Sequence, residues 1–450
     1  MENKSFVDRF FEFETKNRLF SLKDKNGVVV WDVIRFYVFS YISWGKSAQS
    51  SLVKKKSLSS ITYKLKRVFS SFIYYFFHRK CDYYCIIASR DVKNGSSYDR
   101  NSDSIISLLR KQGICFIEDT LLTPESLDYK YKGKTMFSLF FLSRIINKRK
   151  RFDYDFGSII ELVNAEFGET LVSQENLIQI YKHFYQQYFY YKFILARKKP
   201  KKIFVVLNKS FKGLYLAAKE RNIPVYEIQH GEISRPHLMY SYPFNEIDGF
   251  IYSPNYVLTY GSFWGKDCKY PGTKFCSVGN DEFVKINQIN NKKKTSVLVI
   301  SADIYREPLS NFVLDLSSRM HQCIFNYKLH PNEFADVAYY KSVFKNSNNI
   351  VVYTNEKSIP DLLGESAYIF LVQSTVEFEA LAAGVKVISW EHQDYWSLDC
   401  LWNEPGVFLV KDAEEFVSTY REHINDTIEP RVDFFEPFDS NKLKTIFKNE

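Results

Sequence analysis

The sequence predicts an α/β protein built from two Rossmann-like, doubly wound domains that face a cleft. Short apolar runs alternate with helical segments along most of the chain, which is typical of a mostly parallel sheet covered by helices. At 450 residues the chain exceeds the size at which one hydrophobic core stops growing, so two domains are expected. A polar and basic segment, 287–294, separates two series of such elements and marks the boundary.

The N-terminal region, 1–80, is expected to be helical. Phe6, Phe10 and Phe13 recur at near-helical spacing, and a similar repeat runs from Trp31 to Ile42. This region is interpreted either as a cap on the first domain or as an element that faces a membrane.

Part of this region is strongly basic. Between residues 46 and 80 there are nine Lys or Arg and no acid, interleaved with aromatic side chains, and a second basic group lies at 144–151. This composition suits an anionic membrane surface or nucleic acid. No signature of a common nucleic-acid module is present, so we expect contact with the inner face of the cytoplasmic membrane and no nucleic acid. The simpler alternative is a solvated basic face over a packed helix.

The first α/β domain is predicted over 81–285. Its expected strands are short runs rich in β-forming residues, and its expected helices show apolar side chains at helical spacing. Gly113 ends the first of these helices, as glycine commonly does. The strands are predicted at 83–88, 114–117, 203–207, 225–228 and 256–259, and the helices at 103–112, 175–198 and 211–221.

The second α/β domain is predicted over 295–450, where a new series of apolar runs begins abruptly. Its elements alternate in the same way, which again predicts a parallel sheet. The strands are predicted at 296–300, 323–329, 350–353, 368–372, 385–389 and 407–410, and the helices at 309–320, 413–424 and 440–448.

The cysteine and N-terminal patterns indicate a cytoplasmic protein. The seven Cys are scattered without paired CxxC spacing, which argues for reduced thiols rather than a disulfide framework or a zinc site. The N-terminus is charged and lacks the apolar core of a signal peptide, and no apolar run is suited to span a bilayer. We expect localisation in the cytoplasm or at the periphery of the inner membrane.

The most informative segment runs from Ile369 to Ser389. It predicts a buried strand, a polar switch at Ser374, a short helix closed by Gly384, and a second buried strand. Ser374 and Glu377 have the spacing of a capping box. A helix that begins at the carboxyl end of a strand in an open α/β sheet suits a phosphate ligand, and Glu379 follows within reach of a sugar hydroxyl. The segment therefore predicts a nucleotide site, although a capping box alone explains part of it.

Two further polar motifs follow predicted strands. The first, Gln229-His230-Gly231-Glu232, follows the strand at 225–228, and the second, Lys328-Leu329-His330-Pro331, ends the strand at 323–329. Both motifs are expected at the carboxyl edge of a sheet, where ligands of such sheets bind. The alternative for each histidine is a residue that merely ends a strand and begins a turn.

Together the three motifs resemble glycosyltransferases of the GT-B architecture that build bacterial surface polysaccharide. The similarity covers about 203–410 and extends to capsule enzymes that use CMP-linked sialic acid or Kdo, and to CDP-glycerol phosphotransferases. The resemblance implies that His330-Pro331 contacts the nucleotide phosphate. It also implies that Ser374, Thr375 and Glu379 hold phosphate and ribose. The first motif, at 229–232, fits neither group of enzymes fully, and the resemblance leaves His230 and Glu232 as alternative bases.

The sequence thus predicts a glycosyltransferase with His230 and Glu232 as catalytic candidates. Lys328 is expected to add positive charge beside His330 at the leaving phosphate. The expected partners are a nucleotide-sugar donor, with CMP favoured, and a lipid-linked or membrane-bound saccharide acceptor. No cofactor and no metal are expected, since no DxD-like pair follows a strand. The alternatives are a CDP-polyol phosphotransferase, a UDP-sugar enzyme or epimerase, and a non-catalytic membrane-peripheral assembly protein.

Overall fold

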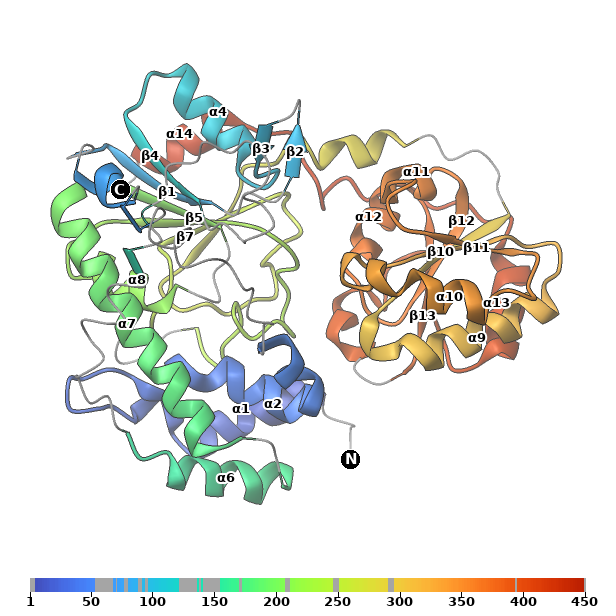
Figure 1. Cartoon of the computed structure of the whole chain (residues 1–450), viewed down its shortest axis with the longest axis horizontal. Coiled ribbons are helices and arrows are strands. Elements are labelled where there is room, and N and C mark those ends of the chain that lie inside the picture. The colour runs from blue at the N-terminus through green and yellow to red at the C-terminus, as the bar shows by residue number, and fades with distance from the viewer. Residues whose placement is uncertain are drawn as a thin grey trace. The chain divides into compact units, whose positions relative to one another are not determined.

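The computed structural model divides the chain into two compact units (Figure 1). It describes residues 5–52, 68–69, 71–76, 80–87, 91–93, 96–120, 136, 139–140, 154–169, 172–206, 211–245, 251–289, 295–392 and 395–448. The first unit comprises Met1–Thr259, Gly265–Val278 and Phe438–Glu450, and the second comprises Tyr260–Trp264 and Gly279–Pro437. Most of the basic segment at 46–80, and all of 144–151, lie outside the described residues.

The first unit contains a six-stranded parallel sheet in the order β4-β1-β5-β6-β7-β8. Its central strands are almost wholly buried apolar runs, as expected for a sheet covered on both faces. The strands are β1 (Tyr83–Ile87), β4 (Phe116–Thr120), β5 (Lys202–Val206), β6 (Val225–Ile228), β7 (Tyr256–Thr259) and β8 (Lys274–Ser277). A small hairpin of β2 (Asp91–Lys93) and β3 (Ser96–Tyr98) lies outside this sheet.

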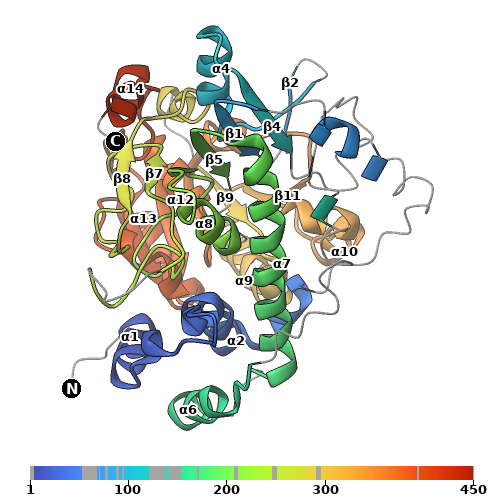
Figure 2. The same ribbon diagram turned by 90° about the vertical axis from the view of Figure 1, so that its left-hand side faces the viewer.

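Helices cover both faces of the first sheet. The helices α4 (Asp103–Lys111) and α14 (Ser440–Lys448) share a hydrophobic core with side chains of β1, β5 and β6. The helices α7 (Gln174–Lys198) and α8 (Lys212–Lys219) run beside each other on the opposite face (Figure 2). The resulting three layers match the predicted doubly wound arrangement.

The predicted N-terminal helices form and pack into the first unit. They are α1 (Phe6–Lys16), whose first turn is capped by the Ser5 hydroxyl, and α2 (Val30–Leu52). Fully buried Glu14 accepts hydrogen bonds from Arg35 Nε at 2.7 Å and from Trp31 Nε1 at 2.7 Å. Arg35 Nη1 also donates to the carbonyl oxygen of Leu238 at 2.5 Å. These bonds attach both helices to the long loop that follows β6.

A second buried ion pair joins α2 to α8. Lys212 Nζ donates to Asp32 Oδ1 at 2.9 Å, and the Tyr242 hydroxyl donates to the same oxygen at 2.7 Å. The other carboxylate oxygen of Asp32 accepts from the backbone N–H of Tyr252 at 2.8 Å. Because Asp32 is fully buried and each oxygen has a donor, the pair is satisfied without water.

The second unit contains another six-stranded parallel sheet, in the order β11-β10-β9-β12-β13-β14. The predicted α/β class with two doubly wound domains is therefore confirmed. The strands are β9 (Ser296–Ile300), β10 (Phe325–Lys328), β11 (Ile350–Tyr353), β12 (Ser366–Leu371), β13 (Lys386–Trp390) and β14 (Val407–Val410). One face packs on α9 (Arg306–Arg319), α10 (Val337–Val343) and α13 (Ala413–His423). Two further short helices are α11 (Ile359–Leu363) and α12 (Val376–Ala382).

The C-terminal helix does not belong to the second unit. The sequence places 295–450 in one domain, whereas the structure assigns Phe438–Glu450, with α14, to the first unit. Leu443 of α14 is fully buried in the core beneath the first sheet, which explains this assignment. At the entry to the second unit, Gly279 has a φ of 76°, and a Cβ there would lie 2.0 Å from the carbonyl oxygen of Pro437. Only glycine fits this close approach.

No described helix combines the length and the apolar character needed to cross a lipid bilayer.

Candidate functional site

The second sheet has a topological switch point between β9 and β12. From β9 the chain builds outward through β10 and β11, and it then returns to the other side of β9 to add β12, β13 and β14. Loops that leave the carboxyl ends of β9 and β12 therefore turn in opposite directions, and ligands of open α/β sheets bind at such points. The loop after β12 contains Ser374 and Thr375, as the sequence predicts for the nucleotide site.

The junction of β12 and α12 differs in detail from the prediction. Helix α12 begins at Val376, and its cap residue Thr375 makes no capping hydrogen bond with its side chain. The Ser374 hydroxyl instead accepts from the N–H of Val376 at 3.3 Å. Glu377 is buried and accepts from the Ser389 hydroxyl of β13 at 2.7 Å. The predicted capping box is therefore wrong, because Glu377 faces the sheet rather than the start of its own helix.

The side chains at this junction remain suited to a phosphorylated ligand. Thr375 is exposed, while Ser374 and Glu379 are half-buried. Since α12 has only seven residues, its dipole is short, and the two hydroxyls are the principal donors that this segment offers. Glu379 lies one turn into the helix, where its carboxylate can accept from sugar hydroxyls.

His330 follows β10, which lies on the other side of β9 from β12, and it is held by hydrogen bonds of its backbone N–H and of its ring. Its N–H donates to the Ser301 hydroxyl at 2.7 Å, and its ring Nδ1 accepts from the N–H of Asn332 at 3.2 Å. Ser301 in turn donates to the fully buried Glu333 at 2.5 Å. Because Nδ1 is an acceptor, the neutral ring carries its proton on Nε2. The exposed imidazole thus offers one N–H donor at the carboxyl edge of β10.

Lys328 has other contacts than the predicted one. Its ammonium donates to the carbonyl oxygen of Thr354 and, at 2.7 Å, to that of Lys357, in the loop after β11. Partial burial lowers the pKa of this lysine. These two carbonyl groups use two of the three N–H donors of the ammonium, and contact between Lys328 and a phosphate stays a prediction.

Aromatic side chains border the same edge of the second sheet. Tyr305, after β9, and His392, after β13, have ring centroids 5.3 Å apart, and His392 meets Trp390 edge-on at 4.4 Å. No role for Ser301, Glu333 or Tyr305 is predicted from the sequence above. Two patterns in the sequence could have indicated these residues. One is the Ser-x-x-x-Tyr spacing after a buried strand, and the other is an acidic residue three positions after His330.

The catalytic candidates lie in the first unit, in the loop that follows β6. Gln229 is fully buried, and its Nε2 donates to the carbonyl oxygen of Gly231 at 2.8 Å, which closes a tight turn. His230 and Glu232 flank this glycine and are both half-buried. The Ser234 hydroxyl donates to Glu232. The turn therefore brings an imidazole and a carboxylate to the carboxyl edge of β6, as predicted.

A cavity of about 310 Å³ opens beside the same loop. It is bordered on one side by α1 and on the other by the continuation of the loop, where Arg235 forms an ion pair with Asp8. Its size lies at the lower end of the range of small-molecule sites. The lining includes Phe11, Thr15, Ser241, Tyr242, Asp267 and Lys269.

A buried carboxyl group, Glu227, lies in β6 directly before the catalytic candidates. Burial raises the pKa of this carboxyl to about 8, although the Tyr240 hydroxyl at 2.6 Å and the Tyr215 hydroxyl at 3.2 Å both bond to it. A charged residue within a run of buried strand residues is the sequence signal for this group.

No metal centre is evident: within the described ranges, no three His, Cys, Asp or Glu side chains come together as metal ligands could.

Comparison with known proteins gives matches only at the level of structure. No protein-family model matches the sequence, and no curated protein sequence is significantly similar to it. A UDP-GlcNAc 2-epimerase from Neisseria meningitidis bound to UDP-GlcNAc is 15% identical, with a TM-score of 0.46 over 82% of this chain and 98% of that one. MurG from Acinetobacter baumannii is 11% identical, with a TM-score of 0.46 over 82% and 98% of the two chains. The Methanocaldococcus jannaschii UDP-GlcNAc 2-epimerase in complex with UDP-GlcNAc and UDP is 12% identical, with a TM-score of 0.46 over 82% of this chain and 99% of that one. Similarity at this level does not assign an activity to the chain.

Proposed function

We propose that the chain is a glycosyltransferase of bacterial surface-polysaccharide synthesis. In this proposal the second unit binds a nucleotide-activated sugar, with CMP-linked donors favoured, and the first unit binds a lipid-linked or membrane-bound saccharide. The observation that supports it most is that Ser374, Thr375 and Glu379, after β12, and His330, after β10, follow strands on either side of β9 at the same carboxyl edge of the second sheet. Two hydroxyl donors, an imidazole N–H and a carboxylate are the groups that a nucleoside phosphate requires.

The reaction assigns one role to each group. A hydroxyl oxygen of the acceptor attacks the anomeric carbon of the donor, and the bond from that carbon to the phosphate oxygen breaks. The departing nucleoside phosphate takes the electron pair, and His330 Nε2–H with the hydroxyls of Ser374 and Thr375 stabilises its charge. His230 or Glu232 takes the proton of the acceptor hydroxyl. Glu379 orients the donor through its ribose hydroxyls.

Thermal unfolding with CMP, CDP, UDP and GDP tests the nucleotide site. A nucleotide at about a hundred times its dissociation constant stabilises its domain by roughly 2.7 kcal/mol. For a domain of this size the expected rise in Tm is about 2–4 °C per kcal/mol. We expect the cytidine nucleotides to raise Tm, and His330→Asn to abolish the rise. Asparagine retains an oxygen that can cap the following turn, so this variant removes the imidazole without removing the cap.

His321→Asn, at an exposed histidine of the same unit, is the matched control and should keep the full shift. A shift with UDP or GDP alone would retain the nucleotide site and exclude cytidine donors. The absence of a shift with every nucleotide would contradict the proposal and favour a non-catalytic assembly protein.

The main alternative enzyme is a CDP-polyol phosphotransferase. It would use the same nucleotide-binding groups, but the acceptor oxygen would attack phosphorus, and the new bond would be a phosphodiester. Product analysis separates the two reactions, because a phosphodiester carries phosphorus into the polymer and a glycosidic bond does not.

An aromatic surface on the first unit supports a membrane-bound acceptor. On the short helix at 71–76, the exposed rings of Phe72 and Phe76 lie 4.9 Å apart, and Tyr75 stacks on exposed Phe193 of α7 at 4.9 Å. The guanidinium of Arg197 lies 4.7 Å from the centre of the Phe76 ring. Exposed aromatic rings next to a cation are suited to the interface of an anionic bilayer.

We expect the protein to sediment with anionic liposomes at low salt and to be partly released at high salt. Phe72→Ser/Phe76→Ser should weaken this binding, because it removes the inserted apolar area, while salt acts only on the charge contribution. Ile324→Ser, at an exposed apolar side chain of the second unit, is the control and should change nothing. If the protein stays in the supernatant at low salt, the membrane contact is excluded.

A further inference from the structure

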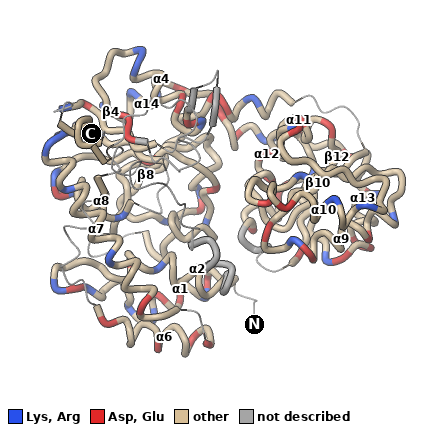
Figure 3. The backbone as a smooth tube through the Cα atoms, in the orientation of Figure 1, with Lys and Arg blue, Asp and Glu red and all other residues tan. Residues whose placement is uncertain are grey.

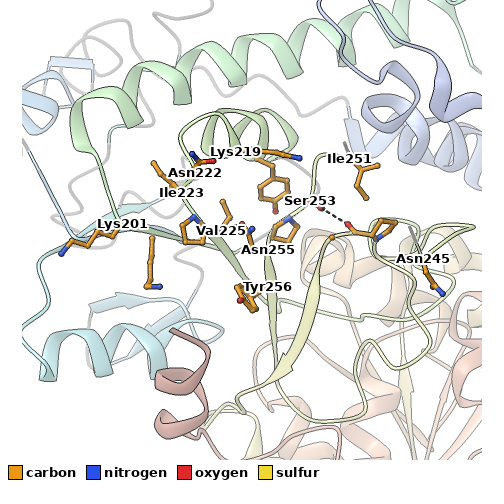
Figure 4. A pocket seen from close by; sticks show the side chains of 16 residues that line it. Lys201, Lys219, Asn222, Ile223, Val225, Asn245, Ile251, Ser253, Asn255 and Tyr256 are labelled. Atoms are coloured by element: carbon orange, nitrogen blue, oxygen red, sulfur yellow. Dashed lines mark hydrogen bonds between the residues drawn. The ribbon is translucent and has the colours of Figure 1, made fainter. Parts of the chain in front are cut away.

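A large cavity lies at the amino edge of the first sheet, opposite the edge that carries His230 and Glu232. Its volume is about 1070 Å³. It is formed by the segments that lead into β5, β6, β7 and β8, together with the last turn of α8 (Figure 4). The proposed reaction uses none of these residues, so the cavity requires a separate explanation.

Among the described residues, the charged side chains that line the cavity are all cationic. Lys201, Lys202 and Lys219 contribute to its wall, and none of its sixteen lining residues is acidic. Elsewhere, acidic and basic residues are interspersed along the described backbone of each unit (Figure 3). Lys201 forms an ion pair with Asp82 at 2.8 Å, outside the lining, and Lys202 lies over the ring of Phe447 at 4.8 Å.

Lys219 is the cation at the end of α8. Desolvation by the surrounding protein lowers the pKa of its ammonium group. An anion bound beside this group would compensate for the lost solvation, because an opposite charge favours the charged form.

Asparagine side chains supply the polar groups of the cavity. Asn255 Oδ1 accepts from the N–H of Val225 at 2.8 Å, which fixes the amide and leaves its Nδ2 as a donor for a ligand. Asn222 adopts a left-handed conformation with φ of 52° at the end of α8, and its side chain is among those shown in Figure 4. Asn245 adds a third amide. Such amides pair equally well with hydroxyl donors and acceptors.

The remaining wall is apolar and stiff. It includes Ile223, Ile251, Tyr256 and three prolines, Pro224, Pro254 and Pro271. Tyr256 is stacked on Tyr226 at 5.1 Å, which fixes the orientation of its ring. The Ser253 hydroxyl donates to the carbonyl oxygen of Pro271 at 3.4 Å and holds two of the lining segments together. A cavity of this size exceeds what a simple ion requires and is at the upper end of the range for organic ligands.

We propose that this cavity binds an anionic saccharide, meaning a sugar that carries a carboxylate or a phosphate. Lysine ammonium groups neutralise the acidic group, asparagine amides bond to ring hydroxyls, and the tyrosine and proline faces cover the apolar face of the sugar ring. The site is separate from the proposed nucleotide site and does not depend on that assignment. In a protein that handles charged sugars, it would hold a part of the acceptor or product away from the reacting atoms.

Saturation-transfer NMR and calorimetry with defined probes test this site in the full chain. The probes are glucuronic acid, glucose 6-phosphate, neutral glucose and inorganic phosphate. We expect both acidic sugars to bind, phosphate to bind more weakly, and glucose to show no binding. Lys219→Gln should lower the affinity for both acidic sugars about tenfold, as expected for loss of one charge-assisted hydrogen bond. Asn222→Gly should also lower this affinity, since glycine keeps the left-handed backbone conformation and removes only the side-chain amide.

The controls distinguish binding at this cavity from binding at the proposed nucleotide site of the second unit. Lys111→Gln, at an exposed lysine of α4, should bind the acidic sugars like the wild type, and so should His330→Asn. Equal binding of glucose and glucuronic acid, unchanged affinity in Lys219→Gln, loss of acidic-sugar binding in His330→Asn, or no binding of either acidic sugar at millimolar concentration would each overturn the proposal. If glucuronic acid alone binds, the ligand is a uronic acid; if glucose 6-phosphate alone binds, it is a sugar phosphate.

Discussion

Replacing Arg35 by alanine is expected to lower the free energy of unfolding of the first unit by about 3–5 kcal/mol. Removal of one partner from a buried ion pair leaves the other charge uncompensated, and this cost is larger than the net contribution of the intact pair. Here Glu14 would lose the bonds from Nε at 2.7 Å and from Nη2 at 2.9 Å while it remains fully buried. The carbonyl oxygen of Leu238 would lose a donor as well. Urea unfolding, followed by a signal of the first unit, measures the effect.

The matched control is Arg9→Ala, since Arg9 pairs with Glu166 at 3.4 Å on the surface. An exposed pair contributes about 0–1 kcal/mol, so this variant should unfold at almost the same urea concentration as the wild type. The double variant Glu14→Gln/Arg35→Met removes both charges and should recover part of the loss. Equal midpoints for Arg35→Ala and Arg9→Ala would show that the Glu14–Arg35 pair does not stabilise the fold.

The second large effect concerns the loop after β6. If His230 or Glu232 is the general base of the proposed transfer, its replacement by alanine should lower kcat by about 10²–10⁴-fold. The shift in Tm caused by the nucleotide should remain, because neither residue belongs to the second unit, which is proposed to bind the nucleotide. Steady-state kinetics over a range of pH is the appropriate measurement. The variant that removes the base should also lose the acidic limb of the pH profile.

The comparison of the two alanine variants identifies the base, since only one of them should lose this limb. Ser234→Ala serves as a neighbouring control: it removes the hydroxyl that donates to Glu232 but neither titratable group. If both alanine variants keep a kcat close to that of the wild type, the loop does not take part in catalysis.

Most strands could be predicted because their sequences are buried on both faces. The runs around Val297–Val299 and Tyr368–Val372 are almost inaccessible to solvent, and such apolar runs have no other stable environment. The strand β8 was not predicted because Lys274–Ser277 is an edge strand with an exposed first residue and half-buried residues after it. Its sequence therefore lacks an apolar signal.

The candidate site could be predicted at the level of its loops but not of its contacts. The alternation of strands and helices predicts a parallel sheet, so the positions of Ser374 and His330 at its carboxyl edge could be predicted as well. Partners distant in sequence were not accessible in this way. Glu377 bonds to Ser389 rather than capping its helix, and Lys328 bonds to carbonyl groups of the next loop. The hydrogen-bond partners of these side chains depend on which face of each helix or strand is buried, and that face is determined only when the sheet assembles.

The return of α14 to the first unit has a consequence for the order in which the chain is completed during synthesis. The sheet of the first unit is translated early, but the helix that buries Leu443 against it is translated only after the whole of Gly279–Pro437. The second unit is continuous apart from Tyr260–Trp264 and can begin to fold on the ribosome while the first still lacks part of its cover. The first unit is therefore completed only after the second, and until then the apolar surface that α14 covers is available to chaperones.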